Sequence, residues 1–189
     1  MRNLELKARC ADLTQAEQTA RQLGATFGGE LRQTDTYFHA PRGRLKLREI
    51  RQLGPGDGED FARSELIFYQ RPEADATRWS DYCTSNVGAP ATMRELLTHA
   101  FGLRQVVQKT RRLYLHQGAR IHLDDVAQLG TFIEFEVPTN DGDEARAHTL
   151  MRTLMHTFGL TATDALHSSY GDEPLVSSSS SSSSSSSEF

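Results

Sequence analysis

The chain has 189 residues, 37% of them hydrophobic, with a formal net charge of −4 and a pI near 6.0, which fits one soluble domain with a core. A weakly acidic chain is not typical of a general nucleic-acid binder, so we expect no nucleic-acid partner. No apolar run is long enough to span a bilayer and the N-terminus shows no signal-peptide pattern, so we expect no membrane partner.

The first quarter of the chain predicts a strand, a helix and two further strands. Apolar and charged side chains alternate over residues 2–9, which is typical of a half-buried strand. Asp12 is a helix N-cap and Gly24 is a helix stop, so we expect a helix over residues 15–23. Two more strands are expected over residues 28–39 and 43–51.

The remainder of the chain predicts five strands and two helices. Residues 53–60 are rich in Gly, Pro and acids and predict a loop. Pro90 and Gly102 mark the beginning and end of a helix, and apolar residues at helical spacing predict another over 143–158. The strands are expected over residues 64–71, 78–86, 104–116, 119–127 and 131–138.

In several of these strands charged side chains alternate with apolar ones, and the charges are grouped by sign. Successive side chains of a strand point to opposite faces, so each of these strands has one charged face. The first and last strands carry acids, while the middle strands carry Arg and Lys. Neighbouring bases repel each other unless an anion lies among them. A sheet closed into a barrel with this face inward would gather bases for phosphates and acids for a metal ion.

A set of motifs occurs in a fixed order along the chain, at residues 2–9, 33–38, 43–49, 66–72, 109–112, 120–124 and 129–136. This ordered set resembles the CYTH family of triphosphate tunnel metalloenzymes, and within it the class IV adenylyl cyclase-like branch. The resemblance covers roughly residues 2–172. The family's first motif is Glu-x-Glu-x-Lys. Glu5 and Lys7 fit it, but Asn3 stands where the first Glu belongs, which puts the usual metal count and the reaction in doubt.

The resemblance implies an α+β, mostly β fold, in which eight antiparallel strands close into a tunnel with flanking helices. It also implies a triphosphate-containing small-molecule partner, such as ATP, tripolyphosphate or thiamine triphosphate, and Mg²⁺ or Mn²⁺ as cofactor. The expected triphosphate-binding residues are Lys7, Arg44, Lys46, Arg48, Arg71, Lys109, Arg111 and Arg120. The expected metal ligands are Glu5, Asp124, Glu134 and Glu136. Assembly of two copies of the chain into a homodimer is also compatible with the sequence.

The residue pattern alone leaves a simpler interpretation open for these charges. Glu134 and Glu136 share one strand face, about 7 Å apart, and could belong to a solvated face with cross-strand ion pairs. The bases could serve solubility, although three on one face, as in Arg44, Lys46 and Arg48, are unusual for a solvated edge.

Two residues are candidates for a catalytic role. Lys7 fits the family's motif, and His122 is placed for proton transfer because it lies between Arg120 and Asp124 in the sequence. The bases would lower the pKa of His122 and the acid would raise it, so the sequence does not decide its charge. A structural role for His122 is an equal alternative.

Three functions are compatible with this sequence. An adenylyl cyclase would form cyclic AMP and pyrophosphate from ATP, and this is the family branch that we favour. A triphosphatase would hydrolyse tripolyphosphate, a nucleoside triphosphate or thiamine triphosphate with the same residues. A non-catalytic binder of phosphorylated ligands is the third, because Asn3 removes one carboxylate.

The end of the chain differs from the rest in composition. We assign residues 1–174 to the CYTH tunnel domain, and residues 175–189 to a disordered poly-Ser tail that is a linker or a cloning scar. Cys10 and Cys83 are the only cysteines and lack Cys-x-x-Cys spacing, so we expect a cytoplasmic protein without a zinc site.

Overall fold

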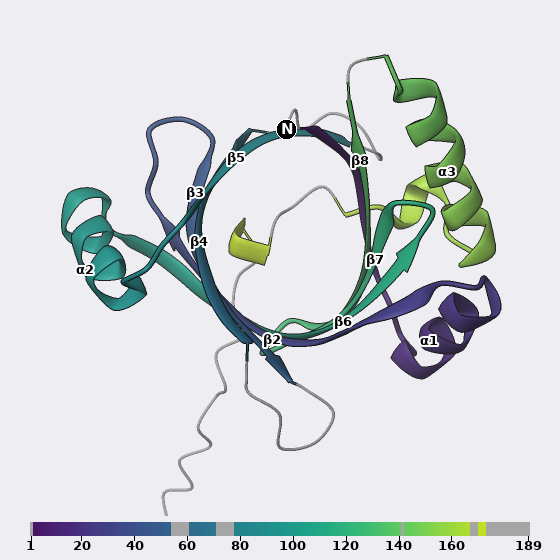
Figure 1. Cartoon of the computed structure of the whole chain (residues 1–189), viewed down its shortest axis with the longest axis horizontal. Coiled ribbons are helices and arrows are strands. Elements are labelled where there is room, and N and C mark those ends of the chain that lie inside the picture. Colours follow the sequence, from purple (N-terminus) through teal and green to yellow (C-terminus); the bar gives the residue numbers. More distant parts are fainter. Residues whose placement is uncertain (1, 54–60, 71–77, 141, 167–169, 173–189) are drawn as a thin grey trace, which may run out of the picture.

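Eight strands form one closed antiparallel barrel, in the order β1-β5-β4-β3-β2-β6-β7-β8 (Figure 1). The computed structural model describes residues 2–53, 61–70, 78–140, 142–166 and 170–172. The strands are β1 (Arg2–Arg9), β2 (Thr26–Phe38), β3 (Arg44–Leu53), β4 (Phe61–Gln70), β5 (Arg78–Asn86), β6 (Leu103–His116), β7 (Ala119–Val126) and β8 (Gly130–Thr139). The helices are α1 (Leu13–Gln22), α2 (Pro90–Phe101) and α3 (Glu144–Thr157). The expected closed tunnel with flanking helices is confirmed.

The barrel closes through β1, which pairs with β5 on one side and with β8 on the other. Each strand therefore has two hydrogen-bonded neighbours, and the sheet presents no free edge for pairing with another chain. Between β6 and β7 the chain turns within two residues, Gln117 and Gly118, which both have positive φ angles (48° and 83°). This is the geometry that a tight hairpin requires.

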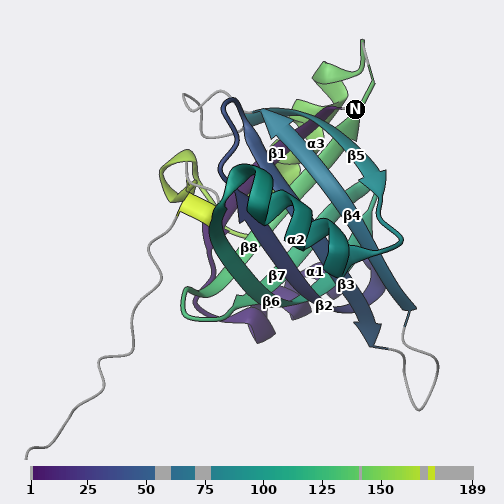
Figure 2. The same cartoon turned by 90° about the vertical axis from the view of Figure 1, so that its left-hand side faces the viewer.

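The apolar core lies outside the barrel, between its outer face and the helices. The outward side chains of β1, β7 and β8 pack against α1 and α3, while α2 covers β2 and β3 on the other side (Figures 1 and 2). Residues of this core include Leu4, Leu6, Ile121, Phe135 and Leu154, which are almost fully buried. Because strand side chains alternate, the charged positions between these apolar ones point into the barrel.

The C-terminal segment returns to the barrel in a way that the periodicity does not predict. The backbone N–H of Leu166 donates to the carbonyl of Lys7 (2.7 Å), and Ala165 forms a bridge with Ala8. Two short 3-10 turns lie in this segment: η1 (Ala162–Asp164) and η2 (Tyr170–Asp172). Figure 2 shows η2, in yellow, at one end of the barrel.

Some sequence predictions need adjustment or lie outside the described ranges. β2 begins two residues and β4 three residues earlier than the expected 28–39 and 64–71. Arg71, most of the predicted loop 53–60 and the poly-Ser tail 175–189 lie outside the described residues. Cys10 and Cys83 are both free cysteines. Among the helices that the structure describes, none combines the length and apolar character needed to cross a membrane.

Candidate functional site

A cavity of about 360 Å³ lies inside the barrel and is lined by side chains of all eight strands and by Tyr170 of η2. Its size falls in the range of small-molecule sites, about 300–1,000 Å³. The predicted site residues that line it are Glu5, Lys7, Lys46, Arg48, Lys109, Arg111, Arg120, His122, Glu134 and Glu136. Two further predictions, Arg44 and Asp124, lie outside this lining, and Arg71 is not among the described residues.

Two buried carboxylates hold the bases of the cavity in place. Asp35 of β2 is 1% exposed and accepts hydrogen bonds from Lys46 (2.9 Å) and from two nitrogens of Arg48 (both 2.8 Å). Burial would raise the pKa of Asp35, but Arg48 and Lys46 more than offset this and hold it well below its usual range. Asp35 is therefore an anionic partner for two of the predicted phosphate-binding residues.

Asp124 of β7 plays the same part for the bases of β6. It is fully buried and accepts from Lys109 Nζ (2.8 Å), from Arg111 (2.6 and 2.7 Å) and from the Tyr170 hydroxyl (3.0 Å). Burial and the neighbouring Arg111 lower the pKa of Lys109 to about 8, which is unusual for lysine. Metal ligation by Asp124 stays a prediction, and its oxygens already have three partners here.

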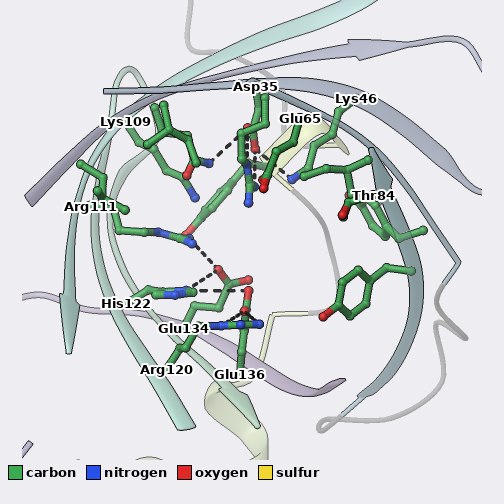
Figure 3. Close-up of a pocket in the computed structure, with 18 of the residues that line it drawn as sticks. Asp35, Lys46, Glu65, Thr84, Lys109, Arg111, Arg120, His122, Glu134 and Glu136 are labelled. Atoms are coloured by element: carbon green, nitrogen blue, oxygen red, sulfur yellow. Dashed lines mark hydrogen bonds and ion pairs between the residues drawn. The ribbon is translucent and has the colours of Figure 1, made fainter. Parts of the chain in front are cut away.

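Glu134 and Glu136 gather around His122, on the side of the cavity opposite Asp35 and Lys46 (Figure 3). His122 Nδ1 lies 3.5 Å from Glu134 Oε2 and 3.8 Å from Glu136 Oε1. Burial and the nearby Arg111 lower the pKa of His122, so its imidazole is neutral at pH 7. Burial opposes ionisation of Glu136, but His122, which is protonated at the low pH where Glu136 titrates, and Arg120 hold its pKa at about 2. Two carboxylates and one neutral imidazole thus meet at one point.

This group fits a divalent cation. One ligand atom from each of His122, Glu134 and Glu136 lies within 4.8 Å of the others, and Glu5 is the direct backbone partner of Glu136 in the β1–β8 ladder. Mg²⁺ and Mn²⁺ both prefer carboxylate oxygens, which Glu134 and Glu136 supply. From the sequence, His122 is a candidate for proton transfer or for a structural role, and its place beside the two acids was not predicted.

Arginines tie the acidic group to its neighbours. Arg111 bridges Asp124 and Glu134, with its Nη2 2.8 Å from Glu134 Oε2. Arg120 binds Glu136 at 2.6 Å, and with its amide in the orientation that satisfies both of its polar atoms, Asn3 accepts from Arg120 Nη2 at 3.2 Å. Asn3 is 4% exposed and lines the cavity, at the position of the missing motif carboxylate.

Several residues that shape the cavity were missed as site residues. Asp35 could have been found, because Gln33, Asp35 and Tyr37 repeat at the spacing of one strand face. Glu65 could have been found by the same rule on β4, whereas Arg63 lies before the predicted strand 64–71. Tyr170 lies in a short turn without periodicity, so no sequence signal pointed to it.

Comparison with known proteins agrees with this geometry. The family model described as the CYTH domain matches residues 1–170. A protein of Methanocaldococcus jannaschii named "Putative adenylate cyclase MJ0240" is 22% identical over 90% of this chain and 97% of its own length.

Solved structures share the fold. The PH1012 protein of Pyrococcus horikoshii has a TM-score of 0.74 and 23% identity, over 89% of this chain and 97% of that one. A protein of Vibrio parahaemolyticus described as a "putative adenylate cyclase" has a TM-score of 0.63 and 21% identity, over 89% and 94%. The barrel, its charged interior and the match over nearly the whole folded chain together establish that this protein belongs to the CYTH family.

Proposed function

We propose that this chain is a metal-dependent enzyme that acts on a triphosphate, and that its reaction is that of a class IV adenylyl cyclase. One observation carries the proposal: a buried acid–imidazole group and four buried or half-buried bases line the same cavity. Phosphoryl chemistry depends mainly on positioning and on charge stabilisation, and this arrangement supplies both. The relatives named as adenylate cyclases favour ATP as the substrate.

The bases would hold the phosphate chain. Lys46 and Arg48 converge on Asp35, and Lys109 and Arg111 converge on Asp124, so each pair is already oriented before a ligand binds. Phosphate oxygens would share these donors with the two aspartates. Arginine can grip a phosphate with two parallel hydrogen bonds, and lysine acts as a point charge. Lys7 Nζ adds a further buried cation.

Glu5, Glu134, Glu136 and the neutral imidazole of His122 would hold Mg²⁺ or Mn²⁺. A bound divalent ion would supply charge stabilisation to the phosphate that reacts. In the cyclase reaction the ribose 3′-hydroxyl oxygen bonds to the α-phosphorus, the bond to the pyrophosphate oxygen breaks, and the hydroxyl proton leaves. Glu134 and Glu136 remain ionised at neutral pH because their pKa values are lowered, so they suit the cation and not proton transfer, and the hydroxyl proton would pass to water.

A triphosphatase is the alternative, since water in place of the 3′-hydroxyl would use the same residues. Phosphorus-31 NMR of the full chain with ATP or tripolyphosphate and Mg²⁺ or Mn²⁺ distinguishes the two. We expect pyrophosphate and cyclic AMP from ATP. Orthophosphate with ADP would contradict the cyclase and identify a triphosphatase. Binding of both compounds without turnover would identify a phosphate-binding module.

A further inference from the structure

Tyr170 of η2 lies against two lysines, Lys7 and Lys109, at one end of the cavity. Its ring centroid is 3.7 Å from Lys7 Nζ and 4.7 Å from Lys109 Nζ, and its hydroxyl donates to Asp124 at 3.0 Å. The ring also packs edge-on against Phe132, with 5.0 Å between centroids. Tyr170 is 4% exposed. A tyrosine so buried, with cations on its face and a carboxylate at its hydroxyl, is held in one position.

The two residues that follow fix this turn to the barrel wall. Gly171 lies so close to the Tyr37 ring that an added Cβ would come within 2.9 Å of it, which leaves no room for a larger side chain. Asp172 accepts hydrogen bonds from Arg44 (2.8 and 3.2 Å) and from Arg104 (2.6 Å). Contacts with β1, β2, β3, β6, β7 and β8 thus hold η2 inside the ring of strands, as Figure 1 shows.

The cavity reaches solvent at its other end. Arg63 of β4 is exposed and yet lines the cavity, and Ile50, its backbone partner on β3, lines it too. Ile50 lies six residues from Arg44 along β3, which is about 20 Å at the usual rise of a strand. Arg63 and Asp172 therefore mark opposite ends of the tunnel. A phosphate chain can enter past Arg63, whereas Tyr170 stands in its way at the far end.

We propose that Tyr170 makes the tunnel one-ended, so that it accepts a phosphate chain with a free terminal phosphate and rejects one that carries a bulky organic group at each end. This inference rests on the proposed function and specifies its substrate class and orientation. The terminal phosphate, which carries the most charge, lies beside Lys7 and Lys109. The organic group stays toward the Arg63 end. Tyr170 is thus a specificity-determining residue.

Isothermal titration calorimetry on the full chain with Mn²⁺ tests this directly. The ligands are tripolyphosphate, ATP and diadenosine triphosphate, in which both ends of the chain carry adenosine. We expect the wild-type protein to bind the first two and to bind the third at least 100-fold more weakly. Tyr170→Ala should strengthen diadenosine triphosphate binding at least tenfold. Tyr170→Phe, which keeps the ring and loses the hydroxyl, should preserve the exclusion.

Each result has a distinct meaning. Equal affinity of the wild-type protein for ATP and diadenosine triphosphate would overturn the one-ended tunnel and leave the proposed function intact. No binding of tripolyphosphate or ATP by the folded protein would overturn the proposed function itself. If Tyr170→Ala does not fold, Tyr170→Val replaces it, because valine keeps an apolar contact with Phe132 but lacks the ring. A folded variant that still excludes the diadenosine compound would contradict the inference.

Discussion

Glu5 and Glu136 are direct backbone partners in the β1–β8 ladder, and both side chains line the cavity. Like charges placed opposite each other on neighbouring strands destabilise a sheet. Glu134 lies two residues before Glu136 on β8, on the same face. A divalent cation among these carboxylates would relieve their repulsion, and this relation supports the metal site that we propose.

Mn²⁺ affinity should therefore depend on Glu136. We expect Glu136→Gln to weaken Mn²⁺ binding at least tenfold, because the variant loses one of two charged ligands on β8. Electron paramagnetic resonance of free Mn²⁺ measures this affinity. Glu65→Gln is the matched control, since Glu65 lines the same cavity but lies beside Asp35 and Lys46 (Figure 3). Equal losses in the two variants would show that Mn²⁺ responds to overall charge and not to a site.

Triphosphate binding near pH 8 should take up protons through Lys109. Its pKa of about 8 means that about half of the molecules carry a neutral Lys109 at that pH. An added phosphate charge raises this pKa, so binding draws up to about half a proton, and affinity falls as the pH rises above 8. Calorimetry in buffers of different ionisation enthalpy measures the uptake. Lys109→Arg, which stays charged, should remove it. Identical heats for the wild-type protein in all buffers would contradict this origin.

Asp35→Asn should destabilise the protein and increase its response to phosphate. The substitution leaves Lys46 and Arg48 without their buried counter-charge, which typically costs about 3–5 kcal/mol of unfolding free energy. A bound phosphate would replace that charge, so pyrophosphate should stabilise the variant more than the wild type. Urea unfolding with and without pyrophosphate measures both effects. Asp125→Asn, at an exposed position on β7, is the control and should change neither value.

Asn3→Glu should strengthen metal binding. Asn3 faces Arg120, which also binds Glu136 at 2.6 Å. A carboxylate at position 3 would compete for Arg120, release Glu136 toward the cation and add one charge to the cavity. We expect Mn²⁺ affinity to rise about tenfold, which corresponds to about 1.4 kcal/mol. Asn3→Gln has the size of Glu without the charge and should leave the affinity near the wild-type value. A rise in both variants would exclude the charge as the cause.

The strands and their inward faces could be predicted because local alternation encodes both. Leu4 and Leu6 are buried in the outer core, while Glu5 and Lys7 between them line the cavity, as the period of two requires. The sequence places acids on the first and last strands, and the β1–β8 ladder brings these acids side by side.

The hydrogen-bond and ion-pair partners of the inward-facing acids could not be predicted, because these partners lie far apart in the sequence. Asp124 and Tyr170 are 46 positions apart, and their hydrogen bond forms only when the C-terminal segment folds back into the barrel. The same fold decides that Asp124 is surrounded by Lys109 and Arg111, whereas Glu136 lies beside His122. The sequence resemblance gives Asp124 and Glu136 the same role, that of metal ligand.

Calorimetric titration of tripolyphosphate into the full chain, with and without Mn²⁺, tests the central claim most directly. We predict one binding event per chain that is much tighter with Mn²⁺, and that the Glu134→Gln, Glu136→Gln double variant loses the effect of the metal while remaining folded. Binding of equal strength with and without Mn²⁺, or no binding to the folded wild-type protein, would contradict a metal-dependent triphosphate site in this tunnel.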